Sequence, residues 1–250
     1  MGLIIVSIFV IVFIIFYILI FVKKTYKYKY DPFYDYDNIK NNIKTGDIIL
    51  FSCKNNRNLY NSIEYLLRTE FIGSEYGHVG IILKDESNNL FVIECVANDH
   101  CADKHATYLN NYKKGGIRII ELEKILNEYC KENAALFAIK FISREIPYSI
   151  AINNLNKYKD ITFENKGRLF ILGIIDVIIS NNIGKKLALK INNNKMCCSE
   201  FAHNFLYNCN VLKKYPSKIF WPHLITNDLF DEIEIVKYSK PYKFKLKNKK

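Results

Sequence analysis

The sequence places a cysteine at the predicted start of a helix and a histidine on a predicted strand about 120 residues earlier. Cys198 precedes Ser199 and Glu200 and then an apolar stretch with helical spacing. A thiol at the start of a helix faces the positive end of the helix dipole, which favours its ionised form. His78 alternates with apolar residues, as on a strand. If this strand passes the start of the helix, the imidazole can take the thiol proton, as the base of a thiol nucleophile does.

A carboxylate on the next predicted strand is the candidate third member of the site. Glu94 has apolar residues on both sides, so its charge needs a partner. Strands at 78–83 and 90–96 are expected to form an antiparallel hairpin through the polar residues 84–89. Because side chains alternate along strands, His78 and Glu94 can share one face, where Glu94 can orient the imidazole. The alternatives are a solvated carboxylate and a hydrogen-bonded core histidine.

Beyond this hairpin, strand-like and helix-like apolar patterns follow one another along the chain. Further strands are expected at 48–52, 117–120, 135–142 and 232–238. Helices are expected at 59–67, at 121–130 and across 147–195, where segment 169–179 is almost wholly apolar. That segment is too short to cross a bilayer, so we expect a buried helix; the alternative is a helix that dips into a membrane or lines an acyl-chain groove. The predicted fold class is α+β, with an antiparallel sheet packed on helices.

Four short motifs occur in order along the chain. They are Gly-Asp-Ile-Ile at 46–49, Gly-His-Val-Gly-Ile at 77–81, Val-Ile-Glu at 92–94 and Cys-Ser-Glu at 198–200. Together they resemble the circularly permuted branch of the NlpC-like papain-fold hydrolases, in which the histidine strand precedes the cysteine helix. The resemblance covers about residues 43–225 and is greatest to the YiiX-like group. This branch includes relatives in poxviruses and other large DNA viruses and, more distantly, the lecithin retinol acyltransferase-like enzymes.

The resemblance implies a permuted papain-like fold and a thiol hydrolase or acyltransferase. Cys198 matches the family nucleophile, His78 the family histidine and Glu94 the third polar residue. The residue before the family cysteine is usually aromatic, whereas this chain has Cys197 there, which is a rival nucleophile. Cys198 is preferred because it is in register with the Ser-Glu pair, and a helix turns the preceding residue about 100° away. The bond attacked would be an amide or an ester, in a peptide, a lipid or a lipidated substrate.

Other chemistries fit the sequence less well. Cys95, His100, Cys101 and His105 crowd into one segment, but their spacing matches no standard zinc motif, and a loop near the mouth of the site is the preferred interpretation. The sequence contains no glycine-rich phosphate loop and no RNA-binding signature. We therefore expect no cofactor, no metal and no nucleic-acid partner, and an acyl amide or acyl ester as the substrate.

The N-terminal residues 3–22 form an apolar run that is about 30 Å long as a helix, the thickness of a bilayer core. No basic segment precedes the run and no small-residue cleavage site follows it, so we expect a retained transmembrane anchor rather than a signal peptide. Lysines follow the run at 23–29. The positive-inside rule then predicts a single-pass membrane protein, in a cellular or virion membrane, with its C-terminal domain on the cytoplasmic side.

The formal net charge of +11 is concentrated partly in residues 23–29 and 243–250, at the edges of the predicted domain, which suits an anionic membrane surface. The seven cysteines have no regular spacing, as in a reducing compartment. The predicted organisation is an anchor at 1–22, a basic linker at 23–42 and a papain-like thiol hydrolase domain at 43–250. The alternative is a catalytically silent, membrane-anchored structural or ligand-binding protein, such as one of a virion.

Overall fold

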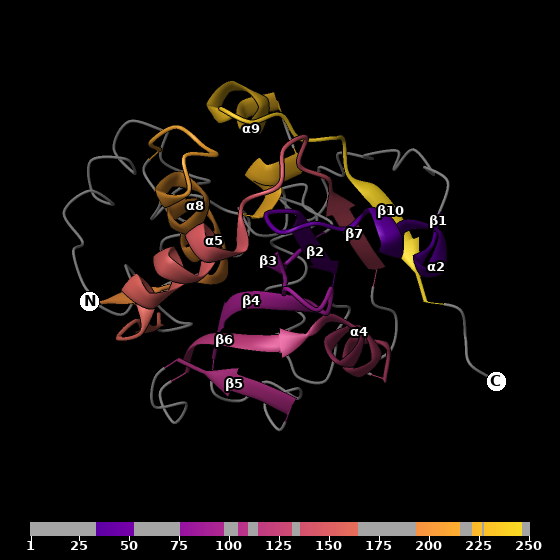
Figure 1. Cartoon of the computed structure of the whole chain (residues 1–250), viewed down its shortest axis with the longest axis horizontal. Helices are drawn as coiled ribbons and strands as arrows, with labels where there is room; N and C mark the ends of the chain where they lie inside the picture. The colour runs from indigo at the N-terminus through magenta and orange to yellow at the C-terminus, as the bar shows by residue number, and fades with distance from the viewer. Residues whose placement is uncertain are drawn as a thin grey trace, which may run out of the picture.

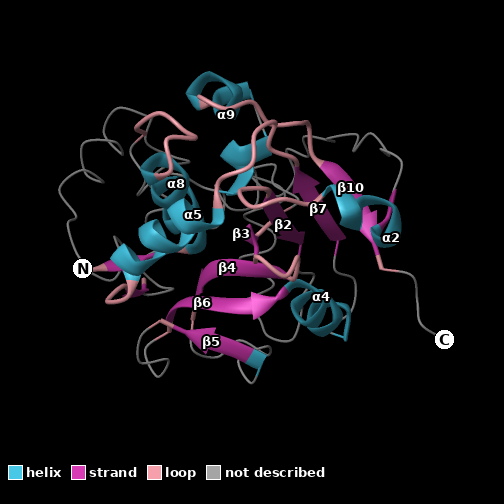
Figure 2. Cartoon of the chain, in the orientation of Figure 1, coloured by secondary structure: helices cyan, strands magenta, loops and turns pink. Residues whose placement is uncertain are grey.

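The computed structural model describes residues 34–52, 76–97, 105–109, 115–131, 136–164, 194–215, 222–226 and 228–246. These residues form a sheet of eight strands with helices around it and a separate pair of short strands. Figure 2 shows the strands running through the middle of the molecule and the helices outside them. The predicted α+β class, with a mostly antiparallel sheet, is confirmed. The permuted papain-like topology stays a prediction.

The large sheet has the strand order β1-β10-β7-β2-β3-β4-β6-β5. Its strands are β1 (Tyr34–Asp35), β2 (Ile48–Ser52), β3 (His78–Lys84), β4 (Leu90–Val96), β5 (Ala106–Tyr108), β6 (Gly116–Glu121), β7 (Leu136–Lys140) and β10 (Tyr242–Lys245). Neighbours are antiparallel except β1 and β10. The small sheet pairs β8 (Thr162–Phe163) with β9 (Lys195–Met196) in parallel. The predicted hairpin corresponds to β3 and β4, and the predicted strands at 48–52, 117–120 and 135–142 correspond to β2, β6 and β7.

Helices cover both faces of the large sheet (Figure 1). The described helices are α2 (Tyr36–Ile39), α4 (Leu122–Lys131), α5 (Tyr148–Leu155), α8 (Cys198–Asn208) and α9 (Asp228–Ile233), with short 3-10 turns η1 (Lys40–Asn42), η5 (Asn156–Tyr158) and η7 (Pro222–Thr226). Helices α5, α8 and α9 pack on the face that carries Val79 and Ile93. Helices α2 and α4 pack on the opposite face, with Ile82 and Val92. Alternation along each strand thus sends successive side chains into two separate cores.

Helix α8 forms because its apolar residues recur at helical spacing and its end is well capped. Phe201 and Phe205 lie one turn apart, and both are fully buried against the sheet. At the C-terminal end, Asn210 adopts a left-handed φ of 57°. The N–H of Val211 then donates to the carbonyl of Leu206 at 2.9 Å, which closes a Schellman motif. The C-terminal end of the helix is therefore defined locally, and its first residue is Cys198.

The expectation of a single-pass membrane protein is corrected by the structure. Among the residues that the structure describes, no helix is both long and apolar enough to cross a membrane. Helix α8, with 11 residues, is about 17 Å long, whereas a bilayer core is about 30 Å thick. Segments 3–22, 59–67 and 169–179, on which the anchor and two further helices were predicted, lie outside the described residues.

Two other segments differ from the sequence-based expectation. Within the predicted linker, residues 34–42 form β1, α2 and η1, and Tyr36 and Ile39 are buried in the core. The predicted strand at 232–238 is instead the end of α9 followed by an irregular segment. Its charged and apolar residues do alternate, but Phe230 and Ile233, three residues apart, are both buried, and this helical spacing decides the local structure.

Candidate functional site

The hairpin of β3 and β4 brings His78 and Glu94 together. Its register pairs Ile81 with Ile93, so Glu94 lies diagonally across from His78 on the same face of the sheet. The Nε2 atom of His78 and the Oε2 atom of Glu94 form a direct hydrogen bond. Glu94 is fully buried, whereas the side chain of His78 is 14% exposed. The predicted contact between the two side chains is therefore present.

A third charged side chain, Arg118, completes the coordination of Glu94. Arg118 on β6 lies directly opposite Glu94 in the register of β4 and β6. Its Nε and Nη2 atoms donate to Oε1 of Glu94 at 2.8 and 2.6 Å, and Arg118 is fully buried. Burial opposes the guanidinium charge, but the Glu94 carboxylate and its hydrogen bonds raise the pKa of Arg118 above its ordinary value. Each oxygen of Glu94 thus has its own cationic partner.

Sequence analysis missed Arg118, although a signal was present. The segment 117–120 reads Ile-Arg-Ile-Ile, so a single charge interrupts an apolar strand. A fully buried charge needs a partner of opposite sign, as the isolated charge of Glu94 does. Two such residues of opposite sign on neighbouring apolar strands are candidates for one buried pair.

Cys198 reaches the same place from the start of α8. Helix α8 packs on the face of β3 and β4 opposite to that of His78 and Glu94, and its first residue is Cys198. The side chain of Cys198 lies close enough to the imidazole of His78 to raise its pKa. The Nε2 atom of His78 is the one that contacts Glu94. Cys198 therefore lies beside the connected group of His78, Glu94 and Arg118, and we call these four residues the thiol site.

The rival nucleophile Cys197 lies in a different environment. It caps α8 with an extended backbone, and its Sγ atom lies 3.5 Å from Oγ of Ser199. Burial, together with the charges of Cys198 and Glu200, raises the pKa of the Cys197 thiol to about 12. The described contacts of Cys197 do not include His78. Cys197 is thus a neutral thiol at pH 7, and the geometry favours Cys198 as the reactive one.

The electrostatics of the thiol site keep His78 protonated. Burial alone would lower the pKa of His78, but the charges of Glu94 and Cys198, and hydrogen bonds to both, raise it to about 10. Phe51 contributes an aromatic neighbour, with its ring centroid 5.6 Å from that of the imidazole. At neutral pH the ring is therefore an imidazolium that bridges a carboxylate and a thiol.

The chain that enters the thiol site is fixed by the carbonyl of Met196. This oxygen accepts the N–H of Glu164 at 3.0 Å, next to the pairing of β8 with β9. It also accepts the thiol of Cys95 at 3.2 Å. Burial raises the pKa of Cys95 well above its ordinary value, so this thiol stays neutral and acts as a donor. The position of Cys198, two residues further on, therefore depends on β4 and β8.

The four residues considered for zinc are not brought together where the structure describes them. Cys95 contacts Met196, whereas His105 lies near Glu128, with Nε2 and Oε1 3.8 Å apart. His100 and Cys101 lie outside the described residues. Within the described ranges, no group of three or more His, Cys, Asp or Glu side chains is arranged to hold a metal ion.

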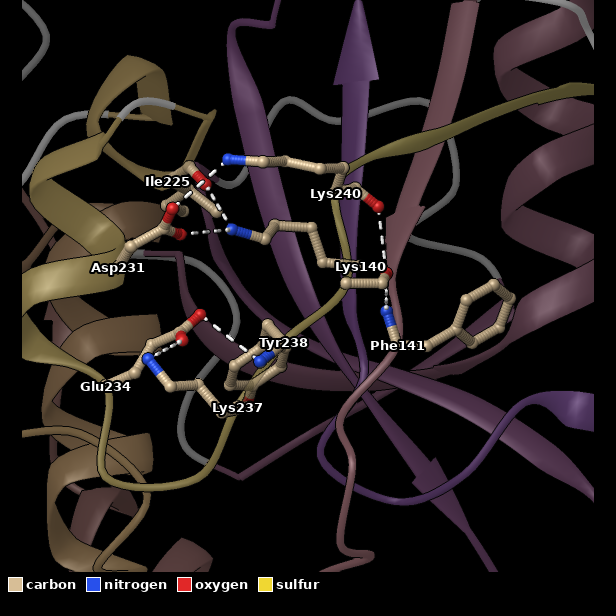
Figure 3. Close-up of polar contacts among 9 residues, drawn as sticks. Lys140, Phe141, Ile225, Asp231, Glu234, Lys237, Tyr238 and Lys240 are labelled. Atoms are coloured by element: carbon tan, nitrogen blue, oxygen red, sulfur yellow. Dashed lines mark hydrogen bonds and ion pairs between the residues drawn. The ribbon is translucent and has the colours of Figure 1, made fainter.

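A second buried cation, Lys140 on β7, lies among residues of the C-terminal part of the chain (Figure 3). It is 2% exposed, and its Nζ atom donates to the carbonyl of Ile225 at 3.0 Å. The same atom lies 4.0 Å from Oδ1 of Asp231 and 4.0 Å from the ring centroid of Phe230. Burial lowers the pKa of Lys140 to about 8, against the smaller opposing effects of Glu234 and Asp231. This lysine ties η7 and α9 to the sheet.

Comparison with known proteins adds one relative. No family model matches the chain. Over 212 residues, 84% of each protein, the chain is 42% identical to "Uncharacterized protein R372" of Acanthamoeba polyphaga mimivirus. Identity of this extent covers most of both chains, and the name of the relative assigns no activity to it. This chain belongs to the same family as that mimivirus protein.

Proposed function

We propose that this protein is a thiol hydrolase or acyltransferase that acts on an acyl amide or acyl ester. Cys198 is the nucleophile, His78 is the acid and base, and Glu94 orients His78. The observation that carries this proposal is the hydrogen bond of His78 to the buried Glu94, next to Cys198 at the start of α8. The same order of residue types serves thiol nucleophiles on unrelated scaffolds.

The proposed reaction proceeds in two steps. The thiolate of Cys198 attacks the carbonyl carbon, and the bond to the leaving amine or alcohol breaks while His78 donates its proton to that group. The acyl group is then held as a thioester. Water or another acceptor, deprotonated by His78, attacks the thioester, and the sulfur leaves as a thiolate. The imidazolium is thereby restored, so atoms and protons balance over the cycle.

The start of α8 supplies a place for the oxyanion of both steps. The first N–H groups of a helix have no intrahelical acceptor, and they point out of its N-terminal end. Cys198 is the first residue of α8, so its own N–H and those that follow lie beside the carbon under attack. Such preorganised donors stabilise developing negative charge more than they stabilise the substrate carbonyl.

The test is iodoacetamide labelling of the full chain between pH 5 and 9, followed by mass spectrometry of each cysteine. We expect Cys198 to be labelled at least tenfold faster than the exposed Cys130 below pH 7. The difference should disappear in His78→Ala. Cys197→Ser is the matched control, because it removes the neighbouring thiol and should leave fast labelling in place.

Two outcomes would overturn the proposal. If Cys198 is labelled no faster than Cys130, or equally fast without His78, the thiol site is not an activated pair, and a binding protein without turnover becomes the better interpretation. If Cys197 carries the fast label instead, the nucleophile is misassigned by one residue.

After a positive result, purified protein is incubated with acyl-amide and acyl-ester substrates of peptide and lipid type. Turnover that is lost in Cys198→Ala identifies the substrate class.

A further inference from the structure

The thiol site holds an unusual number of charges for so buried a place. Glu94 and Arg118 are both fully buried, and Cys198 is 9% exposed. In the reactive form of the proposed function the site contains two anions, the Glu94 carboxylate and the Cys198 thiolate. A single imidazolium cannot neutralise both, and an uncompensated charge in a protein interior is costly.

We propose that Arg118 is a positioning residue that supplies the second positive charge, so that the Glu94 carboxylate and the ionised Cys198 can exist at the same time on either side of His78. This inference rests on the proposed function. Arg118 does not touch the reacting atoms. It acts through Glu94, by occupying Oε1 and leaving Oε2 for His78.

The geometry points to a role in charge rather than in folding alone. The register of β4 and β6 is already set by the strand pairing on both sides of Glu94 and Arg118. An apolar pair of similar volume is often as stable as a buried ion pair, or more so. Apolar residues at 94 and 118 would therefore suffice for the fold. What they would not provide is a positive charge beside the carboxylate that holds His78.

Other ionisable groups lie near the thiol site and also contribute to its electrostatics. Tyr108 of β5 and Tyr129 of α4 lie within electrostatic range of Arg118. Glu200 of α8 acts on the thiols of Cys95 and Cys197. Its carboxylate lies in the first turn of α8, where the helix dipole favours a negative charge. Among the described residues, Arg118 and His78 are the cations shown in contact with Glu94, and the proposed balance of charge is built on these two.

The test compares Arg118→Lys with Arg118→Gln in the full chain, using the pH profile of Cys198 labelling and Cys130 as the internal reference. Lysine keeps the charge, whereas glutamine can keep a hydrogen bond to Glu94 without the charge. We expect Arg118→Gln to slow Cys198 labelling at pH 6.5 at least tenfold and to move its rise to higher pH. Arg118→Lys should slow it about threefold.

A rescue separates charge from structure. The double variant Glu94→Gln with Arg118→Met removes one anion and one cation together, so His78 again faces one thiolate. We expect it to label Cys198 at least threefold faster at pH 6.5 than Arg118→Gln. Circular dichroism checks that each variant is folded. If Arg118→Gln does not fold, the double variant still provides a test, because it leaves neither Glu94 nor Arg118 as a buried charge without the other.

The outcomes distinguish this inference from the proposed function. If wild-type Cys198 is labelled no faster than Cys130, the proposed function fails and this inference fails with it. If wild-type labelling is fast but Arg118→Gln and Arg118→Lys give the same profile, only the role of Arg118 is overturned. If the double variant is labelled as slowly as Arg118→Gln, the role of Arg118 is also overturned, because removing the anion together with the cation would then bring no recovery.

Discussion

Arg118 and Lys140 lie in the same sheet and are almost equally buried, at 0% and 2% exposed, yet they meet different partners. Arg118 donates two hydrogen bonds to a fully buried carboxylate. Lys140 donates to a carbonyl, and its nearest carboxylate, Asp231, is 4.0 Å away and 40% exposed. Burial disfavours both charges. For Arg118 the paired carboxylate outweighs burial and raises the pKa, whereas for Lys140 burial prevails and the pKa falls to about 8.

The comparison shows that the partner, more than the depth of burial, decides whether a buried cation keeps its charge. A carboxylate at hydrogen-bond distance makes Arg118 part of a charged network with Glu94 and His78. A carbonyl dipole and an aromatic ring leave Lys140 close to the loss of its proton under mildly alkaline conditions. The same sheet therefore holds one permanent charge and one that depends on pH.

The largest expected effect is that of breaking the paired site. Glu94→Ala leaves Arg118 and His78 without their shared carboxylate, so we expect the free energy of unfolding to fall by about 3–5 kcal/mol. Lys140→Met should change it by only about 1 kcal/mol, because the methionine replaces a poorly paired charge with a side chain of similar length. Urea unfolding at pH 7 measures both. Equal losses in the two variants would contradict the distinction.

The pH dependence of stability should separate His78 from Lys140 by sign. His78 has a pKa raised to about 10 from an ordinary value of 6.5, so the native state binds its proton more tightly than the unfolded state does. Its stabilising contribution is complete below pH 6.5 and is lost as the pH rises through about 10. We expect this to amount to a few kcal/mol. The loss should be absent in His78→Gln, as followed by urea unfolding from pH 6 to 10.

Lys140 should give the opposite slope. Its pKa is lowered to about 8 from 10.5, so below pH 8 its charge destabilises the native state, and the penalty is relieved as the pH rises from about 8 to 10.5. In Lys140→Met this relief is absent, and stability should therefore fall more steeply over that interval than in the unaltered protein. A parallel curve for the two proteins would show that Lys140 keeps its charge.

The smallest expected effect is that of Asp231→Asn, which removes the nearest carboxylate from Lys140. Because Asp231 is 40% exposed and 4.0 Å away, water screens the interaction, and we expect the free energy of unfolding to change by less than about 0.5 kcal/mol. Glu232→Gln, on the same helix and exposed, is the matched control. Because Asp231 also accepts a hydrogen bond from the exposed Lys240 at 3.1 Å, the same substitution is made in Lys240→Met. A loss above about 1 kcal/mol that persists in that background would mean that Lys140 and Asp231 form a true ion pair.

The sequence allowed the core of the thiol site to be predicted, because Cys198, His78 and Glu94 could each be placed by local pattern. A helix start and a short hairpin are local features, and alternation then decides which side chains share a face. The contact of Arg118 with Glu94 depends on the pairing of β4 with β6, which lies outside the hairpin and has no local signal. The site of Lys140 depends on the packing of η7 and α9 on β7, which is equally remote in sequence.

Two of the sequence-based predictions are corrected by the structure. Residues 232–238 alternate as in a strand, but tertiary packing of Phe230 and Ile233 favours a helix at the start of this segment. Hydropathy, the flanking lysines and the lack of a cleavage site predicted the membrane anchor, and no described helix could cross a membrane. The strand prediction used the alternation of residues 232–238 without the contacts that this segment makes.

The opposed positions of Glu94 and Arg118 also bear on how the sheet finds its register during folding. If β6 slipped by one residue against β4, every side chain of β6 would change face. Arg118 would then leave Glu94 and enter the apolar core beneath α8, where Phe201 and Phe205 pack. Such a state would move the Arg118 charge to the other face of the sheet, away from Glu94, and Glu94 would lose one of the two cations that contact it. The register that the neighbouring residues of β4 and β6 set is therefore also the register that brings Arg118 to Glu94, so correct strand pairing and assembly of the thiol site are a single event.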